Sequence, residues 1–190
     1  MRIIGGTARS MPLKTVKGTD TRPTTDRIKE TLFNMIQNEV PGAVFLDLFA
    51  GSGGIGLEAL SRGARKAVFV DSSRKAAACI RENIAFTKFQ EQSELKCMDF
   101  LAAMRSLEGK YVFDIIFADP PYGRGMAGEV LSCLKDSSLY HEDTLIIVEE
   151  SLDFSPEDLS GKGFEISRIK IYKTNQHIFL KRGTGVYVRQ

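Results

Sequence analysis

The alternation of short apolar runs with helical patterns is the feature that most constrains how this chain folds. From residue 44 onward, apolar runs typical of strands are separated by stretches in which apolar residues recur every three or four positions. Short apolar strands separated by helices predict a parallel sheet that is covered on both faces. The expected strands are VFLDLF (44–49), KAVFVD (66–71), ELKCMD (94–99), FDIIFAD (113–119) and TLIIVEE (144–150).

The segments around these strands complete the predicted fold. Residues 164–183 read as two adjacent strands joined by a turn at Thr174 and Asn175. We therefore expect an α/β fold with a doubly wound, mostly parallel, seven-stranded sheet that ends in an antiparallel hairpin. Residues 1–22 are expected to form a small N-terminal β-hairpin extension, and residues 23–190 the main domain. The expected helices lie within residues 22–40, 54–63, 73–88, 100–107 and 127–137.

A glycine-rich loop follows the first expected strand. Gly51, Gly53 and Gly56 match the pattern G-x-G-x-x-G at the start of a helix, where glycines let backbone N–H groups approach a ligand. Asp71 ends the second strand 20 residues after Gly51, at a position suited to binding ribose hydroxyls. Sites for a nicotinamide dinucleotide and for S-adenosylmethionine share this pattern, so the loop alone does not separate them.

Asp47 distinguishes between the two cofactors. Its carboxylate lies four residues before Gly51, and it is expected to repel a pyrophosphate and to attract an ammonium group. S-Adenosylmethionine carries an amino group and a sulfonium, and it has no phosphate. Asp47 also has a second interpretation, in which its carboxylate braces the loop or the N-terminus of the following helix.

A third carboxylate, Asp99, closes the third expected strand, and the ligands of open α/β sheets bind at this carboxyl edge. Asp99 is expected to accept a hydrogen bond from the adenine amino group, and Phe100 beside it either packs on the adenine ring or belongs to the core. Three carboxylates at three successive strand ends favour a cationic nucleoside. The predicted cofactor contacts are Asp47, Phe49, Gly51, Gly53, Asp71, Ser72, Asp99, Phe100 and Asp119.

The fourth expected strand ends in an unusually stiff and polar corner, Asp119-Pro120-Pro121-Tyr122. The exocyclic amine of a nucleobase is a poor nucleophile, because its lone pair is delocalised into the ring. The Asp119 carboxylate and the Pro120 carbonyl can each accept a hydrogen bond from one of its two N–H groups. These two hydrogen bonds turn the nitrogen lone pair toward a methyl group. The two prolines fix the backbone, and Tyr122 offers a face on which a base can stack. We predict that these four residues are catalytic.

With these motifs in place, the sequence resembles the class I S-adenosylmethionine-dependent methyltransferases, and more narrowly the RsmD family of 16S rRNA (guanine-N2) methyltransferases. The resemblance covers nearly the whole chain. It implies S-adenosylmethionine as cofactor and methylation of the exocyclic N2 of one guanine in 16S rRNA, in the small ribosomal subunit or an assembly intermediate. The stretches that carry it are RIIGG, RPTTDRIKETLFN, DLFAGSGGIGLEALSRGA, the strand ending in Asp71, and DPPY.

Charge is distributed unevenly along the chain, although the net charge is only +2. Residues 1–30 hold seven Lys or Arg against three acids, and residues 161–190 hold seven against one. Basic ends that meet on one face would attract phosphates. The resemblance adds that residues 22–24 lie over the entrance for cofactor and target, and that the N-terminal hairpin touches RNA. The predicted RNA contacts are Arg2, Arg9, Arg22, Pro23, Thr24, Arg27 and Tyr122.

Three alternative functions stay open at this point. An Asp-Pro-Pro-Tyr corner also suits DNA adenine-N6 methylation, although the chain leaves no room for a separate duplex-recognition domain. A nicotinamide-dependent oxidoreductase would share the glycine loop, but Asp47 disfavours it. A noncatalytic RNA-binding protein on the same fold would not need both Asp119 and the glycine loop.

Further expectations concern metals, membranes and assembly. The two histidines, His141 and His177, share no ligand-like spacing with a cysteine or carboxylate, so we expect no metal site. No apolar run approaches the about 20 residues of a membrane span, so we expect a cytoplasmic protein without a membrane partner. We also expect a monomer.

Overall fold

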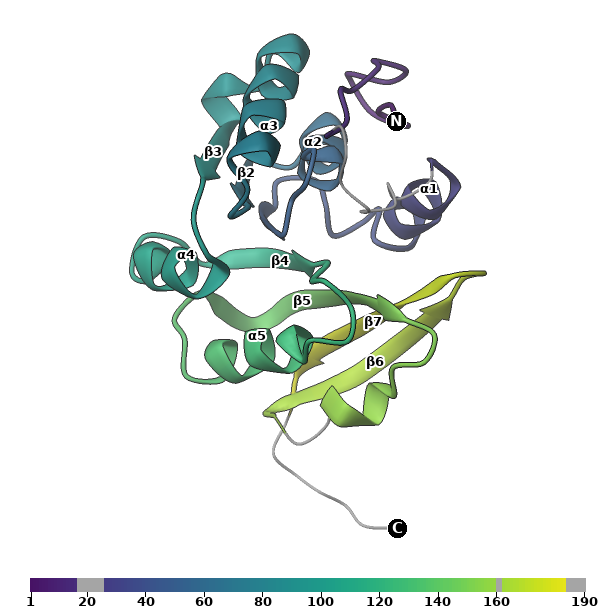
Figure 1. Cartoon of the computed structure of the whole chain (residues 1–190), viewed down its shortest axis with the longest axis vertical. Coiled ribbons are helices and arrows are strands. Elements are labelled where there is room, and N and C mark those ends of the chain that lie inside the picture. Colours follow the sequence, from purple (N-terminus) through teal and green to yellow (C-terminus); the bar gives the residue numbers. More distant parts are fainter. Residues whose placement is uncertain (17–25, 160–161, 184–190) are drawn as a thin grey trace. The chain divides into compact units, whose positions relative to one another are not determined.

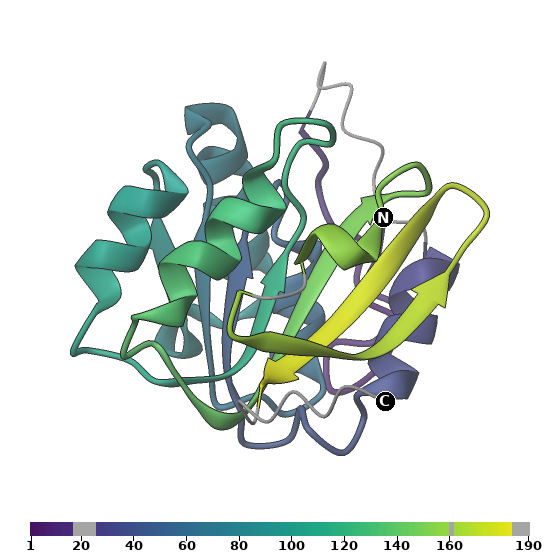
Figure 2. The ribbon, with the colours of Figure 1, turned by 90° about the horizontal axis from the view of Figure 1, so that it is seen from below.

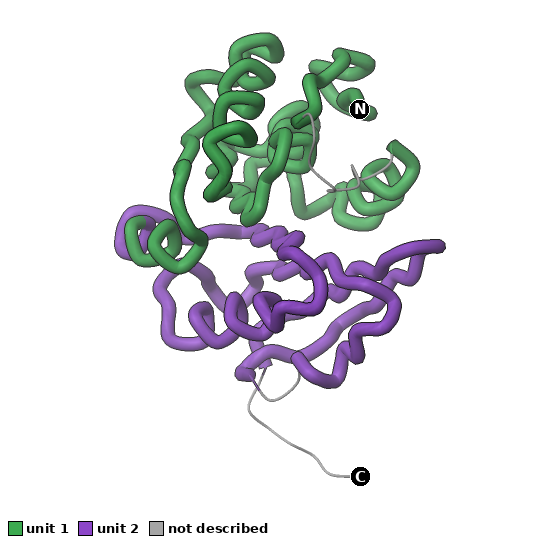
Figure 3. The backbone as a smooth tube through the Cα atoms, in the orientation of Figure 1, with its two compact units in different colours: residues 1–106 green, residues 107–190 purple. Residues whose placement is uncertain are grey.

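The computed structural model describes residues 1–16, 26–159 and 162–183. The chain forms two compact units, unit 1 (Met1–Ser106) and unit 2 (Leu107–Gln190), which are coloured separately in Figure 3. The boundary that the sequence predicted at residue 22 lies outside the described residues. The expected division into residues 1–22 and 23–190 therefore stays a prediction.

Unit 1 is a three-stranded parallel sheet with helices between the strands (Figure 1). The strands are adjacent in the order β3-β2-β1, and the register places Asp47 beside Phe69. Phe45, Leu46 and Phe69 are fully buried and form part of the core. The elements are α1 (Asp26–Met35), β1 (Val44–Leu48), α2 (Gly54–Ser61), β2 (Lys66–Val70), α3 (Arg74–Thr87), the 3₁₀ turn η1 (Gln90–Gln92), β3 (Ser93–Lys96) and α4 (Phe100–Leu107), which ends at the start of unit 2.

The helix α3 illustrates how local chemistry sets these elements. The Ser73 hydroxyl accepts a hydrogen bond from the Ala76 N–H and caps the N-terminus of the helix. Lys88 takes a left-handed conformation, with φ of 62°, and ends it. The predicted apolar stripe, represented by Cys79 and Ile80, is buried. The periodicity of the sequence therefore predicted both the helix and its buried face.

Residues 1–13 double back on themselves within unit 1. A single antiparallel bridge joins Arg2 to Pro12, and the Ile3 N–H donates to the Met11 carbonyl over 3.0 Å. The segment turns back as the sequence predicted, but residues 1–13 contain this isolated bridge and no strand, so the predicted β-hairpin over residues 1–22 stays a prediction.

Unit 2 is a four-stranded sheet in the order β4-β5-β7-β6. β4 and β5 are parallel, whereas β7 runs antiparallel to both β5 and β6. The predicted C-terminal hairpin is therefore confirmed, and Figure 2 shows its two strands along their length. The elements are β4 (Phe113–Ala118), α5 (Met126–Lys135), β5 (Tyr140–Ser151), the 3₁₀ turn η2 (Pro156–Leu159), β6 (Phe164–Ile171) and β7 (Asn175–Arg182).

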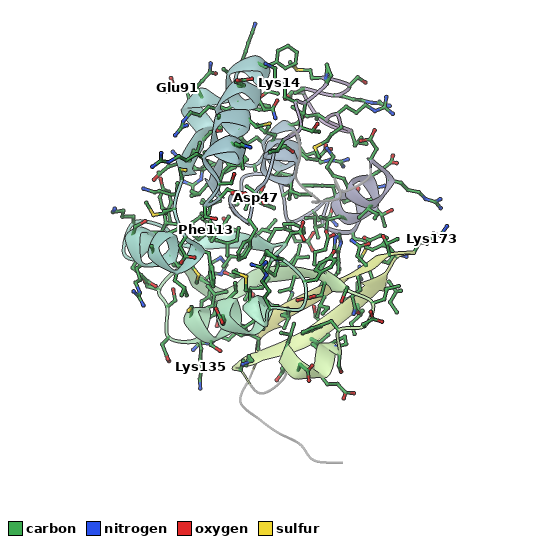
Figure 4. All side chains as sticks on the ribbon, viewed as in Figure 1. Lys14, Asp47, Glu91, Phe113, Lys135 and Lys173 are labelled. Atoms are coloured by element: carbon green, nitrogen blue, oxygen red, sulfur yellow. The ribbon has the colours of Figure 1, made fainter. Side chains whose placement is uncertain are left out.

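The turn of this hairpin differs from the predicted one. β6 ends at Ile171 and β7 begins at Asn175, so the turn comprises residues 172–174, and Lys173 lies at its tip (Figure 4). Asn175 belongs to the strand because it is buried and pairs with Ser151 of β5. Apart from this shift, the seven strands and five α-helices of the described residues occur in the order that the sequence predicted. The predicted α/β fold, with a mostly parallel sheet and a C-terminal antiparallel hairpin, is confirmed.

Candidate active site

The glycine loop turns the chain sharply between β1 and α2. Phe49, Gly51 and Gly53 all have positive φ, at 65°, 58° and 77°. Only glycine adopts such angles without strain, which explains two of the three glycines. A Cβ atom placed on Gly51 would meet nothing within 4 Å, so this side of the loop is open to a ligand.

Gly56 serves packing instead. A Cβ atom on Gly56 would lie 2.3 Å from the Phe69 ring of β2, so any larger residue would push α2 away from the sheet. A Cβ on Gly53 would meet Ile80 and Phe69 at 3.4 Å, which is ordinary contact. The three glycines of the pattern therefore have three different roles: open approach at Gly51, backbone conformation at Gly53, and helix-sheet contact at Gly56.

Asp71 holds the glycine loop from the neighbouring strand. Its Oδ2 accepts a hydrogen bond from the Gly51 N–H over 2.8 Å, and its Oδ1 accepts one from the Ser73 N–H over 2.8 Å. Asp71 is partly exposed and Ser72 beside it is exposed. The structure thus brings the predicted ribose-binding carboxylate directly to the first glycine of the loop.

Asp47, labelled in Figure 4, lies within β1 and is only 2% exposed. Its Oδ2 accepts a hydrogen bond from the Gly56 N–H of α2 over 2.8 Å. This contact matches the interpretation in which Asp47 braces the helix that follows the loop. Direct contact with a cofactor stays a prediction. Burial, with a smaller contribution from the charge of Asp71, raises the pKa of Asp47 to about 7, against the hydrogen bond from Gly56, which lowers it.

We expect Asp47 to make the ligand-free protein less stable as the pH rises. A carboxyl group whose pKa increases on folding favours the folded state below its unfolded value of 3.8, and this contribution is lost as the pH rises through about 7. Between pH 5 and pH 8, wild type should lose about 2 kcal/mol of unfolding free energy relative to Asp47→Asn. Urea denaturation at both pH values measures this difference. An equal difference between the two proteins at both pH values would contradict the assignment.

Asp99 and two phenylalanines form the third part of the predicted cofactor site. Asp99 is exposed, and its Oδ1 accepts a hydrogen bond from the Leu101 N–H over 2.9 Å at the start of α4. Phe100 is 4% exposed, and its ring centroid lies 5.2 Å from that of the partly exposed Phe49. The ring contact places Phe100 beside Phe49, which directly precedes the glycine loop.

The Asp-Pro-Pro-Tyr corner in unit 2 connects β4 to α5. Asp119 follows the last strand residue, Pro120 is buried, and Pro121 and Tyr122 are exposed. Tyr122 has 43% of its surface exposed, and its hydroxyl donates a hydrogen bond to Glu149 over 3.1 Å. Burial and the nearby carboxylates of Glu149 and Asp119 raise the pKa of Tyr122, so its hydroxyl stays protonated at neutral pH.

The residue that binds this hydroxyl, and the side chains that hold it, were not among the predicted site residues. Glu149 of β5 is 5% exposed, and it contacts the buried residues Asn175 and His177 of β7. The sequence feature that could have indicated these buried partners is a cluster of polar residues in otherwise apolar strands. The pairing itself depends on strand register, which the pattern of residue types does not specify.

The predicted RNA contacts are only partly described. Arg9 and Arg27 are exposed, whereas the Arg2 Nε forms an ion pair with Asp26 Oδ2 over 2.9 Å. The predicted contacts Arg22, Pro23 and Thr24 lie outside the described residues.

Among the described residues, no three His, Cys, Asp or Glu side chains come together as potential metal ligands. Within the same part of the chain, none of the helices combines the length and the apolar character that a membrane span requires.

Fold and site together define a class I methyltransferase: a Rossmann-like fold, a glycine loop held by Asp71, and a strand followed directly by Asp-Pro-Pro-Tyr. Residues 1–181 match the model of the family described as conserved hypothetical protein 95. The chain belongs to this family, and the predicted RsmD resemblance is confirmed. This membership favours the methyltransferase prediction over the oxidoreductase alternative.

Named relatives and a solved structure agree with this assignment. The chain is 36% identical over 185 residues to the Bacillus subtilis protein named "Putative rRNA methyltransferase YlbH", covering 96% of this chain and 100% of that protein. It is 37% identical over 155 residues to ribosomal RNA small subunit methyltransferase D of Escherichia coli K12, covering 80% and 76%. The structure described as "Putative methyltransferase yhhF from Escherichia coli" superposes with a TM-score of 0.84, 31% identity, and coverage of 96% and 97%.

Proposed function

We propose that this protein transfers the methyl group of S-adenosylmethionine to the exocyclic N2 of a guanine in 16S rRNA. The observation that carries the proposal is the Asp119-Pro120-Pro121-Tyr122 corner in a chain whose relatives include a small subunit rRNA methyltransferase. In this proposal, unit 1 recognises the methyl donor and unit 2 handles the acceptor amine.

The residues around the glycine loop fit the donor. Asp71 and Asp99 supply carboxylates, Gly51 leaves one side of the loop open, and Phe49 is a partly exposed aromatic ring. This set suits a ligand with hydroxyls, an adenine and a positive charge, whereas a pyrophosphate would meet negative charge. When bound, S-adenosylmethionine supplies an electrophilic methyl group on a sulfonium. Asp71 would hold the ribose hydroxyls and Asp99 the adenine amino group, beside Ser72 and Phe100.

The corner residues orient the acceptor. The Asp119 carboxylate and the Pro120 carbonyl each accept a hydrogen bond from one N–H group of the guanine amine. These hydrogen bonds turn the lone pair of the nitrogen toward the methyl group and keep the amine from rotating. Tyr122 is 43% exposed, and its aromatic ring would stack on an extruded base. As the nitrogen bonds to the methyl carbon and the methyl–sulfur bond breaks, the Asp119 carboxylate would stabilise the positive charge that develops on the amine. The methylated amine then loses one of its N–H protons to solvent, and the donor leaves as the neutral thioether S-adenosylhomocysteine.

Exposed basic residues in unit 1 suit an RNA partner. Arg9 and Arg27 are exposed cations in unit 1 that suit contacts with the RNA backbone. Arg2 contributes less charge, because it is paired with Asp26. The substrate is presented in the small ribosomal subunit or an assembly intermediate, and the protein acts in the cytoplasm as a monomer without a metal.

A labelled-methyl assay tests the proposal. We expect transfer from labelled S-adenosylmethionine to small ribosomal subunits isolated from cells that lack the enzyme, and N2-methylguanosine as the modified nucleoside in mass spectrometry. Large subunits serve as the control. Methylation of adenine, or no transfer to small-subunit rRNA in free or assembled form, would refute the proposal.

A further inference from the structure

Unit 2 contains a cluster of buried polar side chains beneath the exposed ring of Tyr122. Glu149 is 5% exposed, Asn175 4% and His177 0%. Glu149 faces His177 in the antiparallel register of β5 and β7, and Asn175 lies two residues before His177 on the same face of β7. Burying a carboxylate and an imidazole is unfavourable unless each is hydrogen bonded. The arrangement of their hydrogen bonds therefore indicates what the cluster does.

The donors in this cluster converge on Glu149. Its Oε1 accepts from the Asn175 amide and from the Tyr122 hydroxyl, the latter over 3.1 Å, and its Oε2 lies 2.9 Å from His177 Nε2. A carboxylate only accepts, so His177 Nε2 carries the proton in this contact. The other ring nitrogen, Nδ1, lies 3.1 Å from the Tyr172 hydroxyl, which fixes the ring from its far side.

Stability alone does not explain this arrangement. The Asn175 Oδ1 is buried and has no hydrogen-bond partner among the described residues, which is unfavourable. The side chain nevertheless directs its amide toward Glu149. His177 is further enclosed by aromatic rings, with its centroid 5.8 Å from that of Phe117 and 4.9 Å from that of Tyr172. Glu149 is thus a rigidly held acceptor, and Tyr122 is its exposed partner.

Tyr122 needs such a partner, because its backbone lies in a turn with little regular structure. It precedes Gly123, whose φ is 72°, and no helix or strand holds the segment between β4 and α5. A hydrogen bond to a fixed, ionised carboxylate is stronger and more directional than one between neutral groups. It therefore fixes the hydroxyl end of the ring while leaving its face exposed.

We propose that Glu149, held by His177 and Asn175, is a positioning residue that fixes the Tyr122 ring in the orientation in which the target base stacks. This inference rests on the proposed function, because it assigns Tyr122 a role in presenting the acceptor. Glu149 acts through Tyr122 and does not itself touch the base. The two tyrosine hydroxyls stay protonated in this arrangement, since burial and the charge of Glu149 also raise the pKa of Tyr172 to about 12.

A double-mutant cycle on Tyr122 and Glu149 tests the proposal. Tyr122→Phe and Glu149→Gln are each expected to lower kcat for rRNA methylation about 10-fold, while donor affinity from calorimetry changes less than about twofold. Because Glu149 acts through the hydroxyl, the double variant should lose no more than Tyr122→Phe alone. Additive losses would contradict the proposal, because they would indicate a general structural effect. Full kcat in Tyr122→Phe would overturn it, even if Glu149→Gln failed to fold.

Glu150 provides a matched control. It follows Glu149 in β5 and is also buried, at 2% exposed, but it pairs with Gln176 in the register, and its Oε2 accepts from the Ser151 N–H over 3.1 Å. Glu150→Gln is expected to keep kcat within about twofold of wild type. A loss as large as that of Glu149→Gln would show that any change of charge in β5 suffices, and would overturn the proposal.

A second measurement needs no RNA and so separates this inference from the proposed function. The chain has five tyrosines, and the ring signals of Tyr122 in the NMR spectrum of labelled protein can be assigned with Tyr122→Phe. Glu149→Gln should shift these signals and average them through faster ring motion, whereas Glu150→Gln, which removes a charge that acts on Tyr122 but not the acceptor of its hydroxyl, should leave the ring motion unchanged. Unchanged Tyr122 signals in Glu149→Gln would overturn the inference. If wild type shows the anchored ring but transfers no methyl group, the proposed function is what fails.

Discussion

Asp119→Ala is expected to abolish most methyl transfer while leaving donor binding nearly unchanged. The variant removes one of the two acceptors that orient the amine and the only charged one, so kcat should fall about 100- to 1000-fold. Donor recognition depends on the residues around the glycine loop, so the dissociation constant should stay within about threefold. Single-turnover methylation of rRNA and calorimetry with S-adenosylhomocysteine measure the two quantities.

Asp114 offers a control within the same strand. It lies near the start of β4, and its carboxylate pairs with His141 over 3.1 Å. Asp114→Ala removes an acid from β4 without altering the corner, so methylation should remain within about twofold of wild type. Full activity in Asp119→Ala would refute the role of this carboxylate. A loss of donor binding in that variant would instead assign Asp119 chiefly to the cofactor.

Glu58→Ala is expected to produce the largest loss of stability. Glu58 is fully buried in α2, and its two oxygens accept from the N–H groups of Ile4 and Gly5 over 2.7 and 2.8 Å. It also forms ion pairs with Lys29 over 3.3 Å and Arg62 over 2.8 Å. Lys29 is 1% exposed, so removing Glu58 leaves a buried cation without its carboxylate, with the Arg2 carbonyl still accepting from its Nζ, and it takes the acceptor from two partly buried N–H groups.

Breaking one partner of a buried ion pair in this way costs about 3 to 5 kcal/mol. In a protein of this size, such a loss lowers Tm by about 10 °C. Glu82 of α3 is the control, because it forms an exposed ion pair with Lys14, and its loss should cost at most about 1 kcal/mol. Thermal denaturation measures the loss of Tm in each variant relative to wild type. Equal effects of Glu58→Ala and Glu82→Ala would show that the buried pair contributes little.

The Glu58 cluster explains why separate stretches of the sequence occur together. Ile4 and Gly5 belong to RIIGG, Lys29 to RPTTDRIKETLFN, and Glu58 to the helix after the glycine loop. All of them meet at one carboxylate. These stretches carried the resemblance to the methyltransferase family, and part of their shared chemistry therefore serves to attach the N-terminal hairpin and α1 to α2.

The fold was predictable because its elements follow from periodicity. Short apolar runs between amphipathic segments allow few arrangements, and the buried stripe of α3 emerged as expected. The functions of single residues were harder to predict. The position of Asp47 was clear, but only the backbone geometry shows that its carboxylate accepts from the Gly56 N–H. A residue type at a strand end predicts where a side chain lies more reliably than what it contacts.

Strand register set the limit of the sequence analysis in unit 2. The predicted turn included Asn175, which would have removed this residue from β7. With the turn at residues 172–174, Asn175 pairs with Ser151 and His177 pairs with Glu149. Because a shift of one residue moves every side chain to the other face, the partners of Tyr122 became visible only in the structure.

A structure with S-adenosylhomocysteine and an RNA fragment that contains the target guanine would test the central claim most directly. We predict that the donor product contacts Gly51, Asp71 and Asp99, and that the guanine N2 lies about 3 Å from the Asp119 carboxylate. The base should stack on the ring of Tyr122. Donor product bound away from the glycine loop, or a guanine amine held by groups other than the corner, would contradict this account.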